Sequence, residues 1–319
     1  MAEGPASEGT SGDPSGTAGG DPSTAGDDTS TEGAAPPDDR LPASAYECGA
    51  PGPFVAPPRP YRGLCHLDPA CQSPLVVAHR IAPAFAPENS LAALRAAILL
   101  GVDVAESDIR VTADGHAVLL HDASVDRTTD GHGEVAAMTL VELQALRLRP
   151  QPGHPAGDFS CERVPTLAEA IAVAGDQIAL ELEVKTSAAG VAAALLLDEL
   201  DLVGAVYLRC EPAECAALRA AVPDAPIMTV PVGGAALGSV DDLPPPRVVR
   251  VEPLTFAAAD LEAIAAIGAR SSRSALDDVD PLVLGGAEPT LYLDLYGEGL
   301  DMLLTDAPHL VLDALGRGI

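Results

Sequence analysis

The strongest constraint on the fold is a regular alternation, from residue 75 to the C-terminus, between short strand-like runs and alanine-rich segments of helical character. This alternation is typical of repeated strand–helix units, in which the strands form a parallel sheet and the helices cover it. Eight runs qualify as strands: residues 75–78, 102–109, 178–184, 206–209, 226–230, 247–251, 269–274 and 301–305. Eight strands fit a closed α/β barrel of the TIM type, (β/α)8, better than an open sheet.

Helices are predicted between these runs, at residues 90–100, 140–146, 166–174, 212–221, 257–268 and 308–316. The first has Asn89 or Ser90 as its candidate N-cap, and Gly101 follows its last residue as a C-terminal stop. The turn sequence ADG, at residues 113–115, makes the apolar run that follows it a short hairpin partner of the second strand.

Composition divides the chain into three parts. Residues 1–45 are rich in Gly, Ser, Thr, Pro, Ala and Asp and contain almost no large apolar side chain, so they are expected to form a disordered acidic tail. Residues 46–74 contain Cys and Pro and are expected to be irregular, and residues 75–319 form the barrel domain. The tail would suit a surface-tethered protein, although a simple linker or a start assigned too early explains it equally well.

The cysteines indicate the compartment only weakly. There are six, an even number, and no C-x-x-C pair that would indicate a zinc knuckle or a thioredoxin motif. Three of them, Cys48, Cys65 and Cys71, precede the first strand, where a bridge could pin an extended segment. This pattern slightly favours an oxidising, extracytoplasmic location over the cytoplasm, while the N-terminus lacks the basic and apolar regions of a signal peptide.

The formal charge of −29 excludes polyanionic partners, which bind basic protein surfaces. Nucleic acid and anionic membrane surfaces are therefore not expected to bind, and no apolar run approaches the length of a membrane span. An anionic substrate would need local positive charge inside its site.

Polar side chains that could serve in catalysis or binding lie in and directly after the first strands. His79 and Arg80 follow LVVA, Glu106 and Asp108 lie in VDVAESDI, and His121 follows AVLL. Residues two apart on a strand point the same way, so the two carboxylates can share one hard divalent cation. Two imidazoles can serve as general acid and base, and an arginine fork suits a phosphate. The combination predicts metal-assisted cleavage of a phosphate ester.

The same residues carry a resemblance to the glycerophosphodiester phosphodiesterase family, of the phospholipase-C-like superfamily. The ordered motifs are HR at the first strand, PEN, E-x-D, HD followed by DRTT, E-x-K at Glu183 and Lys185, and T-D-x-P beginning at Thr305. The resemblance extends from residue 75 to the C-terminus. It implies hydrolysis of a glycerophosphodiester to glycerol 3-phosphate and an alcohol.

The resemblance also implies a role for each candidate residue. His79 and His121 would transfer protons, without an assignment of which is acid and which is base. Asp122 would either orient His121 or hold the loop. Arg80 and Lys185 would bind the phosphate; Lys185 is the only lysine of the chain. The metal, Ca²⁺ or Mg²⁺, would be held by Glu106, Asp108 and Glu183.

Two departures from the family pattern affect the expected substrate fit. Ile81 follows HR where the family usually has Gly, and the seventh strand reads RSSRS in place of W-T-V-N. Because of these departures, a non-catalytic surface binding module on the same barrel stays open as an alternative. A phospholipase-D-like lyase that forms a cyclic phosphate is the other alternative, since such enzymes share a barrel and two histidines. Because no large insertion separates His121 from the helix at 166–174, an open mouth and a small soluble diester are expected.

Overall fold

The computed structural model describes residues 39–58, 74–150, 156–202, 206–225, 227–229, 248–251 and 258–319, together with Met1 and Cys65. The tail predicted to be disordered lies outside the described residues except for Met1 and residues 39–45. The chain separates into two units, Met1–Glu32 and Gly33–Ile319, and the helices and strands described below belong to the second.

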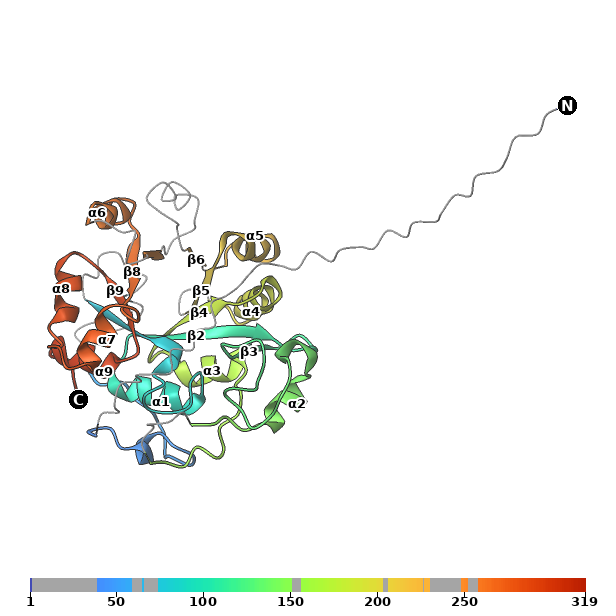
Figure 1. The fold of residues 1–319 in the computed structure, drawn as a ribbon, viewed down its shortest axis with the longest axis horizontal. Coiled ribbons are helices and arrows are strands. Elements are labelled where there is room, and N and C mark those ends of the chain that lie inside the picture. The colour runs from blue at the N-terminus through green and yellow to red at the C-terminus, as the bar shows by residue number, and fades with distance from the viewer. Residues whose placement is uncertain are drawn as a thin grey trace. The chain divides into compact units, whose positions relative to one another are not determined.

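Eight parallel strands form the barrel (Figure 1). Their hydrogen-bonded order is β1-β9-β8-β7-β6-β5-β4-β2, and an additional pairing between β1 and β2 brings the two ends of this order together. The predicted TIM-type fold and its eight strands are confirmed, including the seventh. The strands are β1 Leu75–Ala78, β2 Val104–Val111, β4 Ala179–Val184, β5 Val206–Cys210, β6 Ile227–Thr229, β7 Val248–Val251, β8 Arg270–Ser274 and β9 Met302–Thr305.

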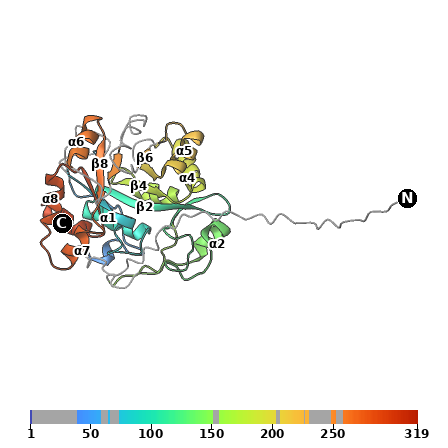
Figure 2. The ribbon, with the colours of Figure 1, turned by 45° about the horizontal axis from the view of Figure 1, so that its top comes forward.

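The ninth strand is the predicted hairpin partner. β3, Ala117–Leu119, pairs antiparallel with β2, and Ile109 lies opposite Leu119. Figure 2 shows β2 and β4 side by side in the sheet, as their pairing requires.

All six predicted helices are present among the described residues. They are α1 Leu91–Leu100, α2 Leu140–Ala145, α3 Leu167–Ala174, α5 Pro212–Ala221, α6 Ala258–Ala266 and α9 Pro308–Ala314. Three more were not predicted: α4 Ser187–Glu199, α7 Val279–Leu284 and α8 Leu291–Gly297. Ser90 is the N-cap of α1, because its hydroxyl accepts a hydrogen bond from the Ala93 amide, and Gly101 ends the helix at φ 81°.

Strand alternation sorts the side chains into two layers. Val76 and Ala78 of β1 pack outward against the helices, whereas Leu75 and Val77 point into a second apolar cluster inside the barrel. The inner cluster consists of residues near the beginnings of the strands, among them Val104, Ala179, Tyr207 and Met302. Every second residue of β2, β4 and β5 continues this inward row. The charged residues near the carboxyl ends of these strands therefore also point into the barrel.

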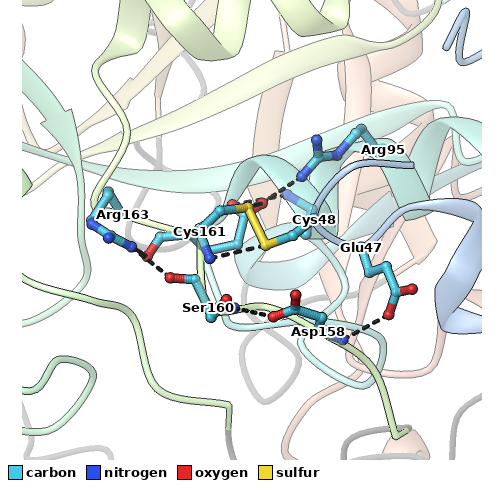
Figure 3. Close-up of a disulfide and its surroundings, with 9 residues drawn as sticks. Glu47, Cys48, Arg95, Asp158, Ser160, Cys161 and Arg163 are labelled. Carbon is cyan, nitrogen blue, oxygen red and sulfur yellow. Dashed lines mark hydrogen bonds and ion pairs between the residues drawn. A yellow bond between two sulfur atoms is a disulfide. The ribbon is translucent and has the colours of Figure 1, made fainter. Parts of the chain in front are cut away.

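Disulfides connect distant parts of the domain. Cys48 is bonded to Cys161 with 5.8 Å between the Cα atoms, which corrects the expectation that it would pair within the cluster before the first strand (Figure 3). The reason is packing: Tyr46 stacks on Phe159 at 6.2 Å, which places the N-terminal segment against the loop after α2. Cys210 is bonded to Cys215, Cys65 is also disulfide-bonded, and no described cysteine is a free thiol.

The two ends of the barrel domain meet. Arg40 donates hydrogen bonds to the Ile319 carbonyl at 2.8 Å and to the Asp313 carboxylate at 2.7 Å. Among the residues described, none of the helices combines the length and the apolar character that crossing a membrane requires.

Candidate functional site

The predicted site residues lie together at the carboxyl ends of neighbouring strands. Ala78, the last residue of β1, is paired with Ala105 of β2, so His79 follows β1 next to Glu106. Asp108 of β2 lies opposite Glu183 of β4 in the sheet register. The carboxyl ends of barrel strands are where TIM-type enzymes place their catalytic groups.

Three carboxylates converge inside the mouth of the barrel. One oxygen from each of Glu106, Asp108 and Glu183 can be chosen so that all lie within 4.8 Å of one another. Glu106 and Asp108 are fully buried and Glu183 is partly exposed. The Arg80 amide donates to Glu106 Oε2 at 2.9 Å, and Asn89 Nδ2 donates to Asp108 Oδ2 at 2.9 Å. Each buried carboxylate is thus fixed by one neutral donor.

Two cations neutralise the remaining oxygens of the three carboxylates. Lys185 Nζ lies 2.9 Å from Asp108 Oδ1 and 2.8 Å from Glu183 Oε1. Arg209, at the end of β5, forms ion pairs with Glu183 Oε2 and, at 3.5 Å, with Glu106 Oε1. All six carboxylate oxygens therefore have a partner within the protein.

Burial and charge divide the pKa values of the three carboxylates. Burial and the neighbouring Asp108 raise the pKa of Glu106. Burial acts the same way on Asp108, but Lys185, His121 and Arg80 outweigh it and lower the pKa of Asp108 far below its usual range. Against its own burial, the pKa of Glu183 is lowered by Arg209 and Lys185.

Lys185 and Arg80, the two phosphate candidates, form ion pairs within the protein. Lys185 pairs with Asp108 and Glu183, because it continues the inward parity of β4. The Arg80 guanidinium lies 3.7 Å from Glu88, and the Arg80 backbone amide donates to Glu106.

His79 is held by a carboxylate from the opposite end of the sequence. Its Nδ1 lies 2.8 Å from Asp306 Oδ1, and its side chain is 14% exposed. Burial disfavours the charged ring, but Asp306 and Glu106 outweigh burial and raise the pKa of His79 to about 9. Asp306 is placed in turn by Asp280, whose carboxylate accepts a hydrogen bond from the Asp306 amide at 2.8 Å. Burial raises the pKa of Asp280 to about 6.

His121 has a matching partner. Its Nδ1 lies 2.8 Å from Asp122 Oδ1, as expected, and its side chain is 23% exposed. Arg127 of the DRTT motif binds Asp122 through Nε at 2.7 Å and Glu88 through Nη2 at 2.7 Å. Burial opposes the charge on Asp122, but hydrogen bonds from His121 and Arg127 lower its pKa well below its usual range.

The turn after β1 has an unusual backbone. Arg80, Ile81 and Ala82 all have positive φ values, of 43°, 61° and 56°. The left-handed region is costly for residues other than Gly, and especially for a β-branched one such as Ile81. The Ile81 side chain is fully buried in the outer core, which compensates for this conformation. The turn therefore forms without the family's glycine.

The donor set fits a hard divalent cation. It offers only carboxylate oxygens, and the three residues are brought together on the inner side of the barrel. A buried cluster of this kind can bind a metal ion. The other described cluster with suitable spacing, Cys48, Cys161 and Glu162, does not qualify because its two sulfurs are joined in a disulfide.

Sequence reasoning missed Arg209, Arg127 and Asp280 as parts of the site. Arg209 could have been found from the sequence. It lies two residues after Tyr207 on the same strand, so both side chains point to the inner side of the barrel. Arg127 lay within a quoted motif but was given no partner. Asp280 lies in a helix that was not predicted, and its buried contacts depend on tertiary structure.

Comparisons with known proteins agree with these motifs. The model of the glycerophosphoryl diester phosphodiesterase family matches residues 79–236, a span that includes every metal, histidine and phosphate candidate named above. A glycerophosphodiester phosphodiesterase of Caldanaerobacter subterraneus is 42% identical over 113 residues, which is 35% of this chain and 45% of that protein. Human glycerophosphodiester phosphodiesterase 1 is 45% identical over 97 residues, 30% of this chain and 29% of the human protein. This chain thus matches less than half the length of these relatives.

Solved structures show the same fold over most of the domain. A glycerophosphoryl diester phosphodiesterase from Parabacteroides distasonis has a TM-score of 0.64 at 23% identity and covers 80% of this chain and 94% of its own. An Oleispira antarctica phosphodiesterase, solved with its product sn-glycerol-3-phosphate, has a TM-score of 0.64 at 24% identity and covers 78% of this chain and 99% of its own. With its ordered motifs, its barrel and the family match across the site, the chain belongs to the glycerophosphodiester phosphodiesterase family.

Proposed function

We propose that this protein hydrolyses a glycerophosphodiester to glycerol 3-phosphate and an alcohol. The observation that carries the proposal is the convergence of Glu106, Asp108 and Glu183 between two imidazoles, each held at Nδ1 by its own carboxylate. This arrangement leaves Nε2 of His79 and His121 as the nitrogen that a substrate can use. The relatives named above are phosphodiesterases of this class, which supports the same substrate class here.

The three carboxylates would hold Ca²⁺ or Mg²⁺, both of which prefer oxygen ligands. When bound, the ion polarises a phosphoryl oxygen and offsets the charge that grows on it. Arg80 and Lys185 lie beside the cluster and would bind the other nonbridging oxygens, since a guanidinium and an ammonium both suit phosphate. The protein thereby supplies positive charge where a net charge of −29 would otherwise repel an anion.

The imidazoles would move the protons. One takes the proton of the attacking hydroxyl, from water or from the glycerol 2-hydroxyl, as the new oxygen–phosphorus bond forms. The other gives a proton to the alkoxide that leaves when the bond to the alcohol breaks. If the 2-hydroxyl attacks, this step gives a cyclic phosphate, and water must then attack the phosphorus and break the ring bond to the 2-oxygen, with the proton roles of the two rings exchanged, to give glycerol 3-phosphate. Asp306 and Asp122 would fix the tautomer and orientation of the two rings. The assignment of acid and base stays open between His79 and His121.

The described disulfides support an extracytoplasmic location. Cys48–Cys161 and Cys210–Cys215 are bonds that oxidising compartments preserve and the cytosol usually reduces. Tethering through the N-terminal tail stays a prediction, since residues 2–38 lie outside the described part of the chain.

A substrate panel tests the proposed function. Small glycerophosphodiesters, such as glycerophosphocholine, are expected to be hydrolysed by the purified protein with Ca²⁺ or Mg²⁺ and not with EDTA. His79→Ala and His121→Ala are each expected to reduce kcat by about 10²–10⁴-fold, the usual range for a lost proton-transfer group. His116→Ala is the control, since His116 is exposed and lies beside Asp114, outside the site.

Phosphorus NMR of the products separates the alternatives. Glycerol 3-phosphate as the final product supports the hydrolase, whereas a persistent cyclic phosphate would identify the lyase. Absence of metal-dependent turnover of any diester would leave the binding module as the remaining reading.

A further inference from the structure

The Arg209 guanidinium forms ion pairs with two members of the carboxylate cluster, Glu106 and Glu183. It ends the inward row of β5 that begins with Tyr207, and it is opposite Glu183 in the sheet register. Its Nη2 bridges Glu183 Oε2 and Glu106 Oε1, the latter at 3.5 Å. These two carboxylates come from different strands, so one nitrogen joins the two sides of the proposed metal site.

A metal ion and Arg209 require the same oxygens. Glu106 Oε2 and Asp108 Oδ2 are turned toward the Arg80 amide and the Asn89 amide group. The other oxygen of Glu106, Oε1, is the one that pairs with Arg209. A divalent cation held by both Glu106 and Glu183 would therefore replace contacts that Arg209 now makes.

Arg209 has a second anchor outside the cluster. Its Nε lies 3.2 Å from Glu181 Oε1, one inward position below Glu183 on β4; this contact is an ion pair by distance and not a hydrogen bond. Arg250 from β7 lies 2.8 Å from the same oxygen, and the Tyr207 hydroxyl donates to Glu181 Oε2 at 2.9 Å. Glu181 is fully buried and is not one of the proposed metal ligands. The guanidinium can thus keep one ion pair while Nη2 leaves the other two.

The backbone at Arg209 is fixed from the other side. Cys210 follows it directly and is bonded to Cys215 in the first half of α5. Both cysteines are buried. Together with the pairing of β5 to β4 and β6, this bridge restrains the backbone, so we expect the guanidinium to change position by side-chain rotation.

We infer that Arg209 is an internal competitor of the divalent cation: it sets the metal affinity of the site, and the ion binds only when Nη2 moves away from Glu106 and Glu183. The inference rests on the proposed function, because it takes these carboxylates as the metal ligands. Under this competition the apparent dissociation constant equals the intrinsic one divided by the fraction of molecules in which the oxygens are free of Arg209, so it is larger than the intrinsic constant. Removing the guanidinium removes this cost.

Isothermal titration calorimetry with Ca²⁺ tests the inference on the full chain. Arg209→Gln is expected to tighten Ca²⁺ binding by about tenfold or more, because the competing cation is lost. Arg209→Lys is expected to fall between Arg209→Gln and the wild type, since one ammonium retains charge but cannot contact three carboxylates at once. Arg209→Lys still tests the inference if Arg209→Gln does not fold. Thermal unfolding without metal verifies that each variant is native.

Arg250→Gln is the matched control. It removes a guanidinium from the barrel interior, 4% exposed against 18% for Arg209, that pairs with Glu181 and, among the described contacts, with none of the three proposed ligands. A similar gain in affinity in Arg209→Gln and Arg250→Gln would mean a general charge effect and would overturn the inference. Unchanged or weaker binding in both Arg209 variants would also overturn it while leaving the metal site intact. Absence of Ca²⁺ binding in the wild type and in every variant would overturn the metal site itself, and the inference with it.

Discussion

The carboxylates that hold the two imidazoles fix the orientation of these rings. Asp306 reaches His79 from the loop after β9, and Asp122 is the direct neighbour of His121 in the sequence. A ring held at Nδ1 by a carboxylate keeps its orientation, and for His79 the nearby charge of Asp306 also raises the pKa of the ring. The two histidines therefore depend on residues that make no contact with the proposed metal ligands in the described structure.

Asp306→Asn is expected to lower the pKa of His79 from about 9 toward or below its usual value, because burial remains while the main favourable charge is lost. NMR titration of the imidazole resonances in EDTA measures this change. Asp313→Asn is the control, since Asp313 is an exposed partner of Arg40. An unaltered His79 pKa in Asp306→Asn would contradict this account.

The same shift affects stability. A folded-state pKa above the usual value means that His79 contributes stability below about pH 6.5 and that this contribution is lost as pH rises through about 9. The free energy of unfolding of the wild type is therefore expected to decline between these pH values from this source. The decline should be smaller in Asp306→Asn, as measured by urea unfolding at about pH 6 and about pH 9.5.

Some residues and contacts of the site could be predicted from the sequence, and others could not. Glu106, Asp108 and Glu183 were predictable because two-residue spacing fixes which side chains share a face. The same rule would have found Arg209 on β5. Neither the contact between His79 and Asp306 nor the Cys48–Cys161 pair could be predicted from spacing, because each joins residues far apart in the sequence.

At the scale of elements, the strands were the more predictable part. β8 shows why: its polar sequence is tolerated because Ser271 bonds to Asp301 through both its amide and its hydroxyl. α4 was missed although it is rich in alanine. Gly190 lies inside it, where a Cβ atom would be 2.7 Å from Val184, so the glycine permits close packing of the helix on β4. α7 and α8 are short and depend on tertiary contacts.

The Cys48–Cys161 disulfide links the segment before the barrel to the loop that caps α1. Glu162 follows the bridge, accepts a hydrogen bond from the Ala92 amide at 3.2 Å, and is ion-paired with Arg95 (Figure 3). The bridge joins two cysteines that are 113 positions apart in the sequence, so it removes much conformational freedom from the unfolded chain.

The double variant Cys48→Ser/Cys161→Ser is therefore expected to lose up to ~4–5 kcal/mol of unfolding free energy by the chain-entropy relation. Urea unfolding measures the loss. Cys210→Ser/Cys215→Ser is the comparison, because its bridge spans only five residues and should cost roughly 2 kcal/mol by the same relation. A larger loss in the short-loop variant would show that local strain or packing, and not loop closure, governs these bonds.

For the whole molecule, charge is the dominant property. A protein of net charge −29 repels an anionic diester at long range, while the buried cations of the site act only at short range. Added salt screens the first interaction more than the second.

The value of kcat/KM for a net-anionic diester, such as glycerophosphoglycerol, is accordingly expected to rise about two- to fivefold between about 20 and about 200 mM KCl. Steady-state kinetics measures the change. Glycerophosphocholine, whose positive choline group balances the phosphate, is the control and should vary little. A fall in kcat/KM with salt for the anionic diester would indicate that attraction by the site dominates the encounter.

The closure of the barrel sets the order in which this chain can finish folding. β1 pairs with β9, yet the two strands lie more than two hundred residues apart, and Ala78 meets Thr305 only at the far end of the sequence. During synthesis on the ribosome, the first strand made must wait beside β2 with one edge open until the last strand emerges. Any chain that stops short of β9 would carry both His79 and the three carboxylates but would lack the seam that closes the ring and the aspartate that holds its first imidazole.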